Sequence, residues 1–253
     1  MTDLPRIISV DDHVIEPPDL WQRWLPAKYR EDGPRVERQY GQVRYLKRRQ
    51  AFKQYDPGAG RGSWADVWVF DGLAMPLVGG LASAGSDATN ADNAPMTFEQ
   101  MRPGTHQQPA RLADMDLNHT EASLNFPTFP RFCGQTFLEA DDKELALACV
   151  QAYNDWMIEE WCGGDGRGRL LPMTLIPLWD PDLAAEEVRR CADKGTTSIA
   201  FSESPAALDL PSIHSGAWNP LWQACVDTGT VVNCHIGSSS MFPITSVDAP
   251  MVA

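Results

Sequence analysis

Apolar runs and amphipathic stretches alternate through the second half of the chain. The run LLPMTLIPL (170–178) predicts a buried strand, and Asp180 and Pro181 then predict the N-cap and first turn of the helix DLAAEEVRRCADKG. TSIAFS, a helix that begins at Asn219, and TVVNCHIG repeat the same order. Apolar strands separated by helices are typical of a parallel sheet with helical crossovers.

The first half of the chain adds further elements. A strand over 7–11 runs into Asp12 and His13, and Asp19 is a candidate N-cap for a short helix, LWQRWLP. EASLNFP predicts another strand, and apolar positions at three- and four-residue spacing predict an amphipathic helix over 141–161. Between these parts, residues 32–110 lack a sustained pattern. We expect an irregular insertion there, with WADVWVF as a strand and a polar lid over 79–109.

The strands of this pattern define the expected architecture. Five of them are convincing, near 7–11, 121–126, 170–177, 197–202 and 230–235. An eight-stranded (β/α)8 barrel would need roughly three more strand–helix units. We therefore expect one α/β domain over 1–253, of the (β/α)8 barrel type, truncated before its last strands.

Composition narrows the classes of function. The 253 residues are 43% hydrophobic, enough for a full-sized core, and the formal net charge is −13. Such a surface repels nucleic acid and anionic membranes, so we expect neither as a partner. No signal peptide pattern or run of 18 apolar residues is visible, which favours a cytoplasmic protein. The six cysteines form no CxxC pair and are expected to be buried thiols.

Chemistry is expected where the parallel strands end, because active sites of such folds lie at the carboxyl ends of the strands. Asp11 and His13 are two residues apart, so on an extended segment both side chains point the same way. A carboxylate and an imidazole that converge suit Zn²⁺ or Mn²⁺. The alternative is that Asp11 and Asp12 end a turn and His13 is merely exposed. The pattern leaves both interpretations open.

Other polar residues near the strand ends are candidates for catalysis or binding. His235 is placed for acid–base work or ligation, or is a buried structural histidine. Arg131 could bind a substrate carboxylate, or pair with a surface acid. The remaining candidates are, for metal binding, Glu203 and His214 and, for substrate binding, Asn125, Trp179 and Ser238.

Four segments together resemble the amidohydrolase-related family of metal-dependent (β/α)8 barrels. They are VDDHVIEPPDLW, RLLPMTLIPLWDP, FSES and VVNCHIGSSS. The pattern is similar to the group that includes aminocarboxymuconate-semialdehyde decarboxylase. The resemblance implies that Asp11 and His13 are metal ligands and that His235 is the acid–base group. It places a further ligand after SIAFS, where Glu203 stands, and His214 is an alternative from the nearby loop.

The resemblance also implies an activity. We expect one divalent ion, Zn²⁺ or Mn²⁺, in a hydrolase or carboxy-lyase that acts on a small carboxylated or aromatic substrate. Both reactions would use the same residues, so the sequence does not separate them. The competing expectations are a truncated barrel remnant without a competent site and a binding protein without turnover. A homodimer is compatible with the sequence.

Overall fold

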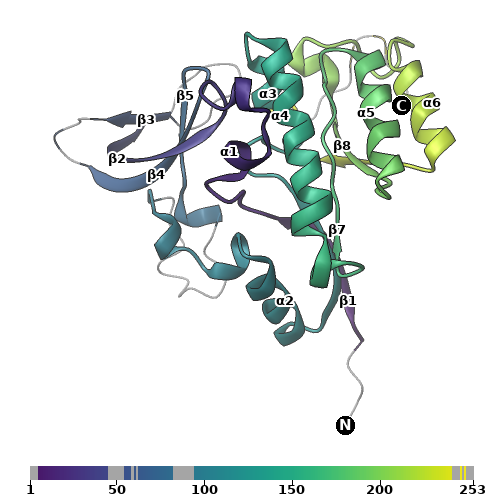
Figure 1. Cartoon of the computed structure of the whole chain (residues 1–253). Helices are drawn as coiled ribbons and strands as arrows, with labels where there is room; N and C mark the ends of the chain where they lie inside the picture. The colour runs from purple at the N-terminus through teal and green to yellow at the C-terminus, as the bar shows by residue number, and fades with distance from the viewer. Residues whose placement is uncertain are drawn as a thin grey trace.

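A parallel α/β part and a separate antiparallel sheet make up the computed structural model (Figure 1). The structure describes residues 5–44, 54–57, 60, 62–81, 94–240, 246 and 248. In Figure 1 the antiparallel sheet lies at the left and the two C-terminal helices lie at the right.

The parallel strands come from both halves of the chain. They are β1 (Ile7–His13), β6 (Thr120–Phe126), β7 (Leu170–Leu171), β8 (Ser198–Ser202) and β9 (Val231–His235). β6 lies between β1 and β7, and β8 pairs with β9, while a bridge between Thr174 and Ile199 connects the two groups. A mixed α/β fold with parallel strands is therefore confirmed. Within the described ranges these strands form a three-stranded and a two-stranded sheet rather than a closed barrel.

The strand predicted at 170–177 is shorter than expected. Regular pairing stops after Leu171, because Pro172 has no N–H to donate. Farther along, the buried amide of Asn154 takes the place of a strand partner. It accepts from Leu175 N at 2.7 Å and donates to Leu175 O at 2.9 Å.

Four of the six α-helices in the described residues follow segments that the sequence predicts. The described residues contain α1 (Leu20–Trp24), α2 (Gln108–Leu117), α3 (Gln135–Glu139), α4 (Lys143–Trp156), α5 (Pro181–Asp193) and α6 (Asn219–Thr228). Asp180 caps α5 as predicted, since its carboxylate accepts from the N–H groups of Asp182 and Leu183. Asp19 lies at the N-cap position of α1 but makes no such bond. Its carboxylate pairs instead with Arg23 at 2.8 Å.

The expectation of an irregular segment over 32–110 is wrong in part. This region forms a four-stranded antiparallel sheet in the order β3-β2-β4-β5, with β2 (Arg35–Arg44), β3 (Gln54–Pro57), β4 (Ser63–Phe70) and β5 (Leu73–Pro76). The predicted strand WADVWVF is β4. Part of the predicted lid, 82–93, lies outside the described residues. The described remainder of the lid contains short 3-10 turns at Gly79–Leu81, Phe98–Gln100 and Pro103–Thr105.

Aromatic packing joins the antiparallel sheet to the rest of the molecule. Trp68 of β4 is fully buried, stacks on Phe129 at a centroid distance of 4.9 Å and meets Trp21 of α1 edge-on at 5.1 Å. Phe70 and Phe137 extend the same cluster. Large aromatic side chains that bury fully in this way contribute strongly to core stability. Trp68 and Phe70 of the antiparallel sheet therefore belong to the main core, whereas Tyr55, Ala65 and Val67 form a smaller cluster of their own.

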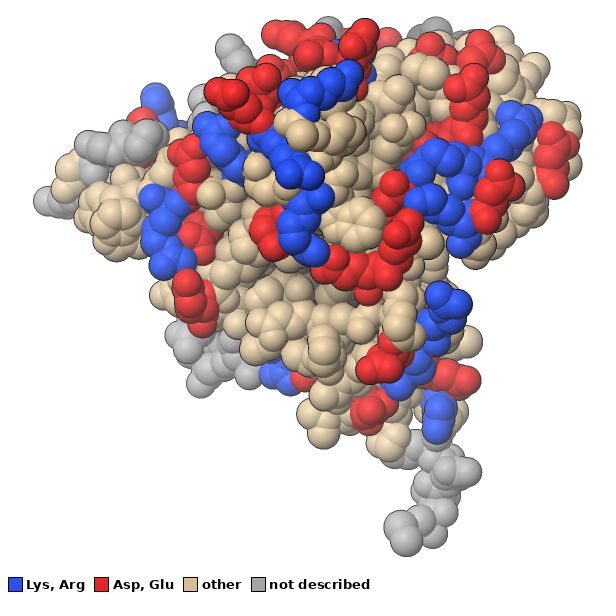
Figure 2. Space-filling model, in the orientation of Figure 1, with Lys and Arg blue, Asp and Glu red and all other residues tan. Residues whose placement is uncertain are grey.

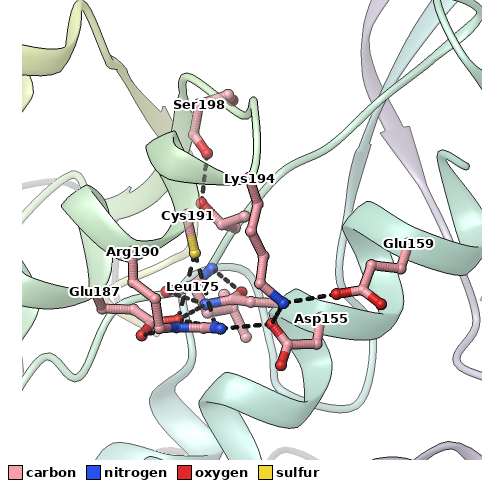
Figure 3. A network of polar contacts seen from close by, with 10 residues as sticks. Asp155, Glu159, Leu175, Glu187, Arg190, Cys191, Lys194 and Ser198 are labelled. Atoms are coloured by element: carbon pink, nitrogen blue, oxygen red, sulfur yellow. Dashed lines mark hydrogen bonds and ion pairs between the residues drawn. The ribbon is translucent and has the colours of Figure 1, made fainter.

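A network of charges holds α5 against the end of α4 (Figure 3). The Arg190 guanidinium contacts Glu187 at 2.7 Å and Asp155 at 2.6 Å. Lys194 bridges Asp155 and Glu159, the latter in a π-helical turn (Met157–Trp161) that continues α4. Because Glu187 is almost completely buried, its pairing with Arg190 compensates the cost of burying its charge.

Charges of both signs are interspersed over the face that Figure 2 shows. No helix in the described part of the chain is both long and apolar enough to cross a membrane. All six cysteines are free, as predicted, and all except Cys234 are buried.

Candidate metal centre

Three potential metal ligands converge where β1 and β9 end. Asp11 and His13 extend from the end of β1, and His235 is the last residue of β9. One ligand atom from each residue lies within 4.8 Å of the ligand atoms of the other two. Among the described residues, these three form a group of acidic and histidine side chains that could hold one metal ion. Strand alternation accounts for the pairing of Asp11 with His13, as the sequence predicts.

His235 contacts Asp11 directly through Nε2. His235 Nε2 lies 3.0 Å from Asp11 Oδ1, and His235 Nδ1 lies 2.6 Å from the carbonyl oxygen of Ile236. A carbonyl only accepts, so Nδ1 donates its proton there. Nε2 then faces the Asp11 carboxylate. It either carries a proton that it donates to the carboxylate, or presents a lone pair to a cation that both residues would share.

Aromatic rings enclose the two imidazoles. Phe132 stacks on His235 at a centroid distance of 4.1 Å, and Phe126 meets the same ring edge-on at 5.0 Å. Burial and the nearby His235 lower the pKa of His13, against the opposing effect of Asp11. The His13 ring also bonds to the backbone of Pro127. The lowered pKa favours the neutral form of His13, which is the form that binds metal ions.

The cluster is open on one side. The Asp11 side chain is 66% exposed, whereas the His235 side chain is 13% exposed. A site with two imidazoles and one carboxylate resembles catalytic zinc sites, which keep a further position for water or substrate. The donor set therefore fits a divalent ion such as Zn²⁺ or Mn²⁺.

A second polar network lies on the opposite face of β1 and β6. Asp12 accepts from the Ser123 hydroxyl, and Asn125 Nδ2 donates to Ser123 Oγ at 2.6 Å. Arg111 of α2 donates to Asn125 Oδ1 and, at 2.7 Å, to the carbonyl of His13. Asn125, predicted to bind substrate, belongs to this second network. Its fully buried side chain faces away from the cluster and supports β1 from behind.

Glu203, predicted as a further metal ligand, does not belong to the group of Asp11, His13 and His235. Its carboxylate accepts from Gly237 N at 3.0 Å, from Ser239 Oγ at 2.7 Å and from Ser238 Oγ. Although burial opposes its charge, the hydroxyls of Ser238 and Ser239 hold the pKa of Glu203 below its usual value. The turn after β9 therefore satisfies this carboxylate. Ser238, predicted to bind substrate, is fully buried and bonds to Glu203.

The other predicted residues lie outside the cluster of Asp11, His13 and His235. His214 is exposed and lines a separate hollow together with Ser204, Ser212 and Glu203. Arg131 pairs with Glu139 at 2.6 Å and bonds to Ser240, which bears out the alternative of pairing with an acid. The partly buried Trp179 packs against the core, with the Lys143 ammonium 5.3 Å from its ring centroid.

Glu16, in the segment that follows β1, supports the aromatic side of the site. Its fully buried carboxylate accepts from the backbone N–H groups of Thr128 and Phe129, both at 2.9 Å. These bonds fix the segment that leads from β6 to Phe132. The sequence places Glu16 next to the motif but gives no sign of this partner.

A comparison with family models identifies the family of the chain. The model described as Amidohydrolase matches residues 33–253. The chain belongs to the amidohydrolase family. Members of this family generally use a divalent metal ion, and the group of Asp11, His13 and His235 supplies suitable ligands in this amidohydrolase.

Solved structures extend the comparison. An amidohydrolase from Mycobacterium avium subsp. paratuberculosis K-10 is similar with a TM-score of 0.61 and 24% identity, over 93% of this chain and 60% of that one. The likeness concerns the fold alone, and this amidohydrolase spans about 60% of that relative's length. A 2,6-dihydroxybenzoate decarboxylase in complex with 2,6-dihydroxybenzoate gives a TM-score of 0.44 and 17% identity, over 92% and 50% of the two chains. No curated protein matches significantly.

Sequence reasoning missed two contributors to the site of this amidohydrolase. Phe132 follows Arg131 in a loop, and nothing in FPRFCG indicates that its ring stacks on a histidine more than 100 residues away. Arg111 lies on a helix whose apolar spacing says nothing of its bond to the His13 carbonyl.

Proposed function

We propose that the protein is a metal-dependent enzyme of the hydrolase or carboxy-lyase type, with one divalent ion held by Asp11, His13 and His235. The convergence of these three side chains where β1 and β9 end carries the proposal. We further propose that the five parallel strands belong to a (β/α)8 barrel, since family membership and the strand order support it.

In this proposal His235 is a ligand rather than the proton carrier that the sequence predicted. Its Nδ1 is engaged by the Ile236 carbonyl, and its Nε2 points at Asp11. A bound Zn²⁺ or Mn²⁺ would supply Lewis acidity toward a carbonyl or carboxylate oxygen of the substrate. Phe126 and Phe132 exclude water from the imidazoles, and the exposed side of Asp11 admits the substrate.

The substrate we propose is a small carboxylated or aromatic molecule. The aromatic rings at the site suit a planar apolar body, and a divalent cation binds a carboxylate or carbonyl oxygen. Hydrolysis and decarboxylation place such an oxygen at the same open position, so a panel of amides, esters and aromatic acids would separate the two reactions.

Metal content tests the proposed ligands directly. We expect about one tightly bound ion per chain in the wild-type protein and its loss in His13→Ala and His235→Ala, because two protein ligands hold such an ion poorly. Elemental analysis after dialysis would measure this. His214→Ala is the matched control, since this exposed histidine lies outside the cluster. Equal metal content in all four proteins would refute the assignment.

A further inference from the structure

The turn that follows β9, residues 236–239, connects Glu203 to His235. Glu203 follows β8 directly, and Ser202 and His235 are partners in the register of β8 and β9. The Glu203 carboxylate lies over this turn and accepts the N–H of Gly237 and the hydroxyls of Ser238 and Ser239. A carboxylate that receives three such bonds fixes the turn firmly.

One peptide group carries both contacts. The carbonyl of Ile236 accepts from His235 Nδ1 at 2.6 Å, and the N–H of the same peptide, on Gly237, donates to Glu203 Oε1 at 3.0 Å. Hydrogen bonds in such a chain polarise one another. The negative carboxylate draws on the peptide N–H, which makes the carbonyl at its other end a stronger acceptor for the imidazole.

We propose that Glu203 is a positioning residue for His235. Through the peptide between Ile236 and Gly237, its carboxylate holds the imidazole by Nδ1–H and leaves Nε2 directed at Asp11. This inference deepens the proposed function and rests on it for the role of His235 as a ligand.

The arrangement corresponds to the support that metal-binding histidines receive elsewhere in proteins. Their second ring nitrogen donates to a carboxylate or a backbone carbonyl, and loss of such a partner weakens metal binding. Here a carbonyl is the direct partner and a carboxylate acts behind it. Glu203 therefore contributes to the site without a bond to the metal.

The geometry of the turn is constrained on its other side as well. Gly237 has a φ of 87°, and a Cβ there would lie 3.4 Å from the Phe132 ring that stacks on His235. Gln135 Nε2 donates to the carbonyl of Ser238. Because these contacts hold the turn independently of Glu203, removal of the charge alone need not displace it.

Glu203→Gln removes the negative charge of the side chain and keeps nearly the same shape. The amide oxygen of Gln can still accept from Gly237 N–H, while the negative charge is lost. Ser239→Ala is the matched control, because it removes one bond to the carboxylate but leaves the charge and the shared peptide intact. Circular dichroism would establish that both variants are folded.

The first readout needs no metal. In the metal-free protein at one fixed pH, NMR would follow the His235 Nδ1–H proton. We expect it downfield and slow to exchange in the wild type, upfield and faster in Glu203→Gln, and unchanged in Ser239→Ala. A wild-type Nδ1–H without protection, or one insensitive to Glu203→Gln, would overturn the proposal.

The second readout is the affinity for Zn²⁺ itself, from competition with a chelator. We expect about tenfold weaker binding in Glu203→Gln and a change within about threefold in Ser239→Ala. Equal losses in the two variants would show that Glu203 only anchors the turn, against the proposal. A wild type that binds no Zn²⁺ but keeps the Glu203-dependent Nδ1–H signal would refute the metal site while supporting the positioning.

Discussion

Glu16 is a fully buried carboxylate whose donors among the described residues are backbone N–H groups. Burial raises its pKa from an ordinary value near 4.5 to about 7, although the N–H groups of Phe129 and Thr128 act in the opposite direction. The folded state therefore holds this proton more tightly than the unfolded chain does. Stability that depends on Glu16 is complete below pH 4.5 and is lost as the pH rises to 7.

This linkage gives a measurable pH dependence. We expect the free energy of unfolding of the wild type to fall by about 3 kcal/mol between pH 4.5 and 7.5 because of Glu16. Glu16→Gln should lack this part of the dependence of the free energy of unfolding on pH. Urea unfolding of both proteins at several pH values would measure the difference. Parallel curves for the two proteins would show that Glu16 ionises normally in the folded state.

At the residue scale, strand alternation predicted the pairing of Asp11 with His13, and position at a strand end predicted His235. The structure places the side chain of Asn125 on the opposite face of β6 from Phe126. Glu203, predicted as a metal ligand, lies outside the group of Asp11, His13 and His235 and binds serines that are 35 and 36 positions away. Long-range partners of this kind leave no periodic trace in a sequence.

At the scale of elements, local signals predicted the helices well because caps and apolar spacing are short-range. The antiparallel sheet was missed for a physical reason. Along β2 the exposed and half-buried positions give little apolar contrast, so RVERQYGQVR shows no clear strand pattern. Its order comes from pairing with β4 over seven residue pairs, which only the fold reveals.

The caps offer a test at this scale. Asp180→Ala should lower the free energy of unfolding by about 1 kcal/mol, because two N–H groups at the start of α5 lose their acceptor. Asp19→Ala provides the comparison, since Asp19 occupies the N-cap position of α1 without a cap bond. Its loss should cost about 0.5 kcal/mol or less, through the exposed pair with Arg23. Urea denaturation measures both, and equal effects would contradict the assignment.

At the scale of the whole molecule, Trp68 connects the antiparallel sheet to the parallel part. Trp68→Ala should lower the free energy of unfolding by about 3–5 kcal/mol, because it opens a cavity between β4, α1 and Phe129. Trp64 lies on the same strand, is 59% exposed and contacts Tyr40. Trp64→Ala should therefore cost about 1 kcal/mol or less.

Chemical denaturation followed by circular dichroism would compare the two tryptophan variants. Separate transitions for the antiparallel sheet and the parallel part in the wild type would contradict a shared core. A single transition that Trp68→Ala shifts strongly and Trp64→Ala shifts little would support it.

The ligand group joins the first parallel strand to the last, since Asp11 lies on β1 and His235 on β9. A cation held by both would act as a reversible cross-link between distant parts of the chain. Because the ion would bind the folded site and not the unfolded chain, it would stabilise the folded form more as the free ion concentration rises above its dissociation constant. Removal of the ion by a chelator would then loosen the intervening strands and helices together. The resistance of the protein to proteolysis would fall when the site is emptied.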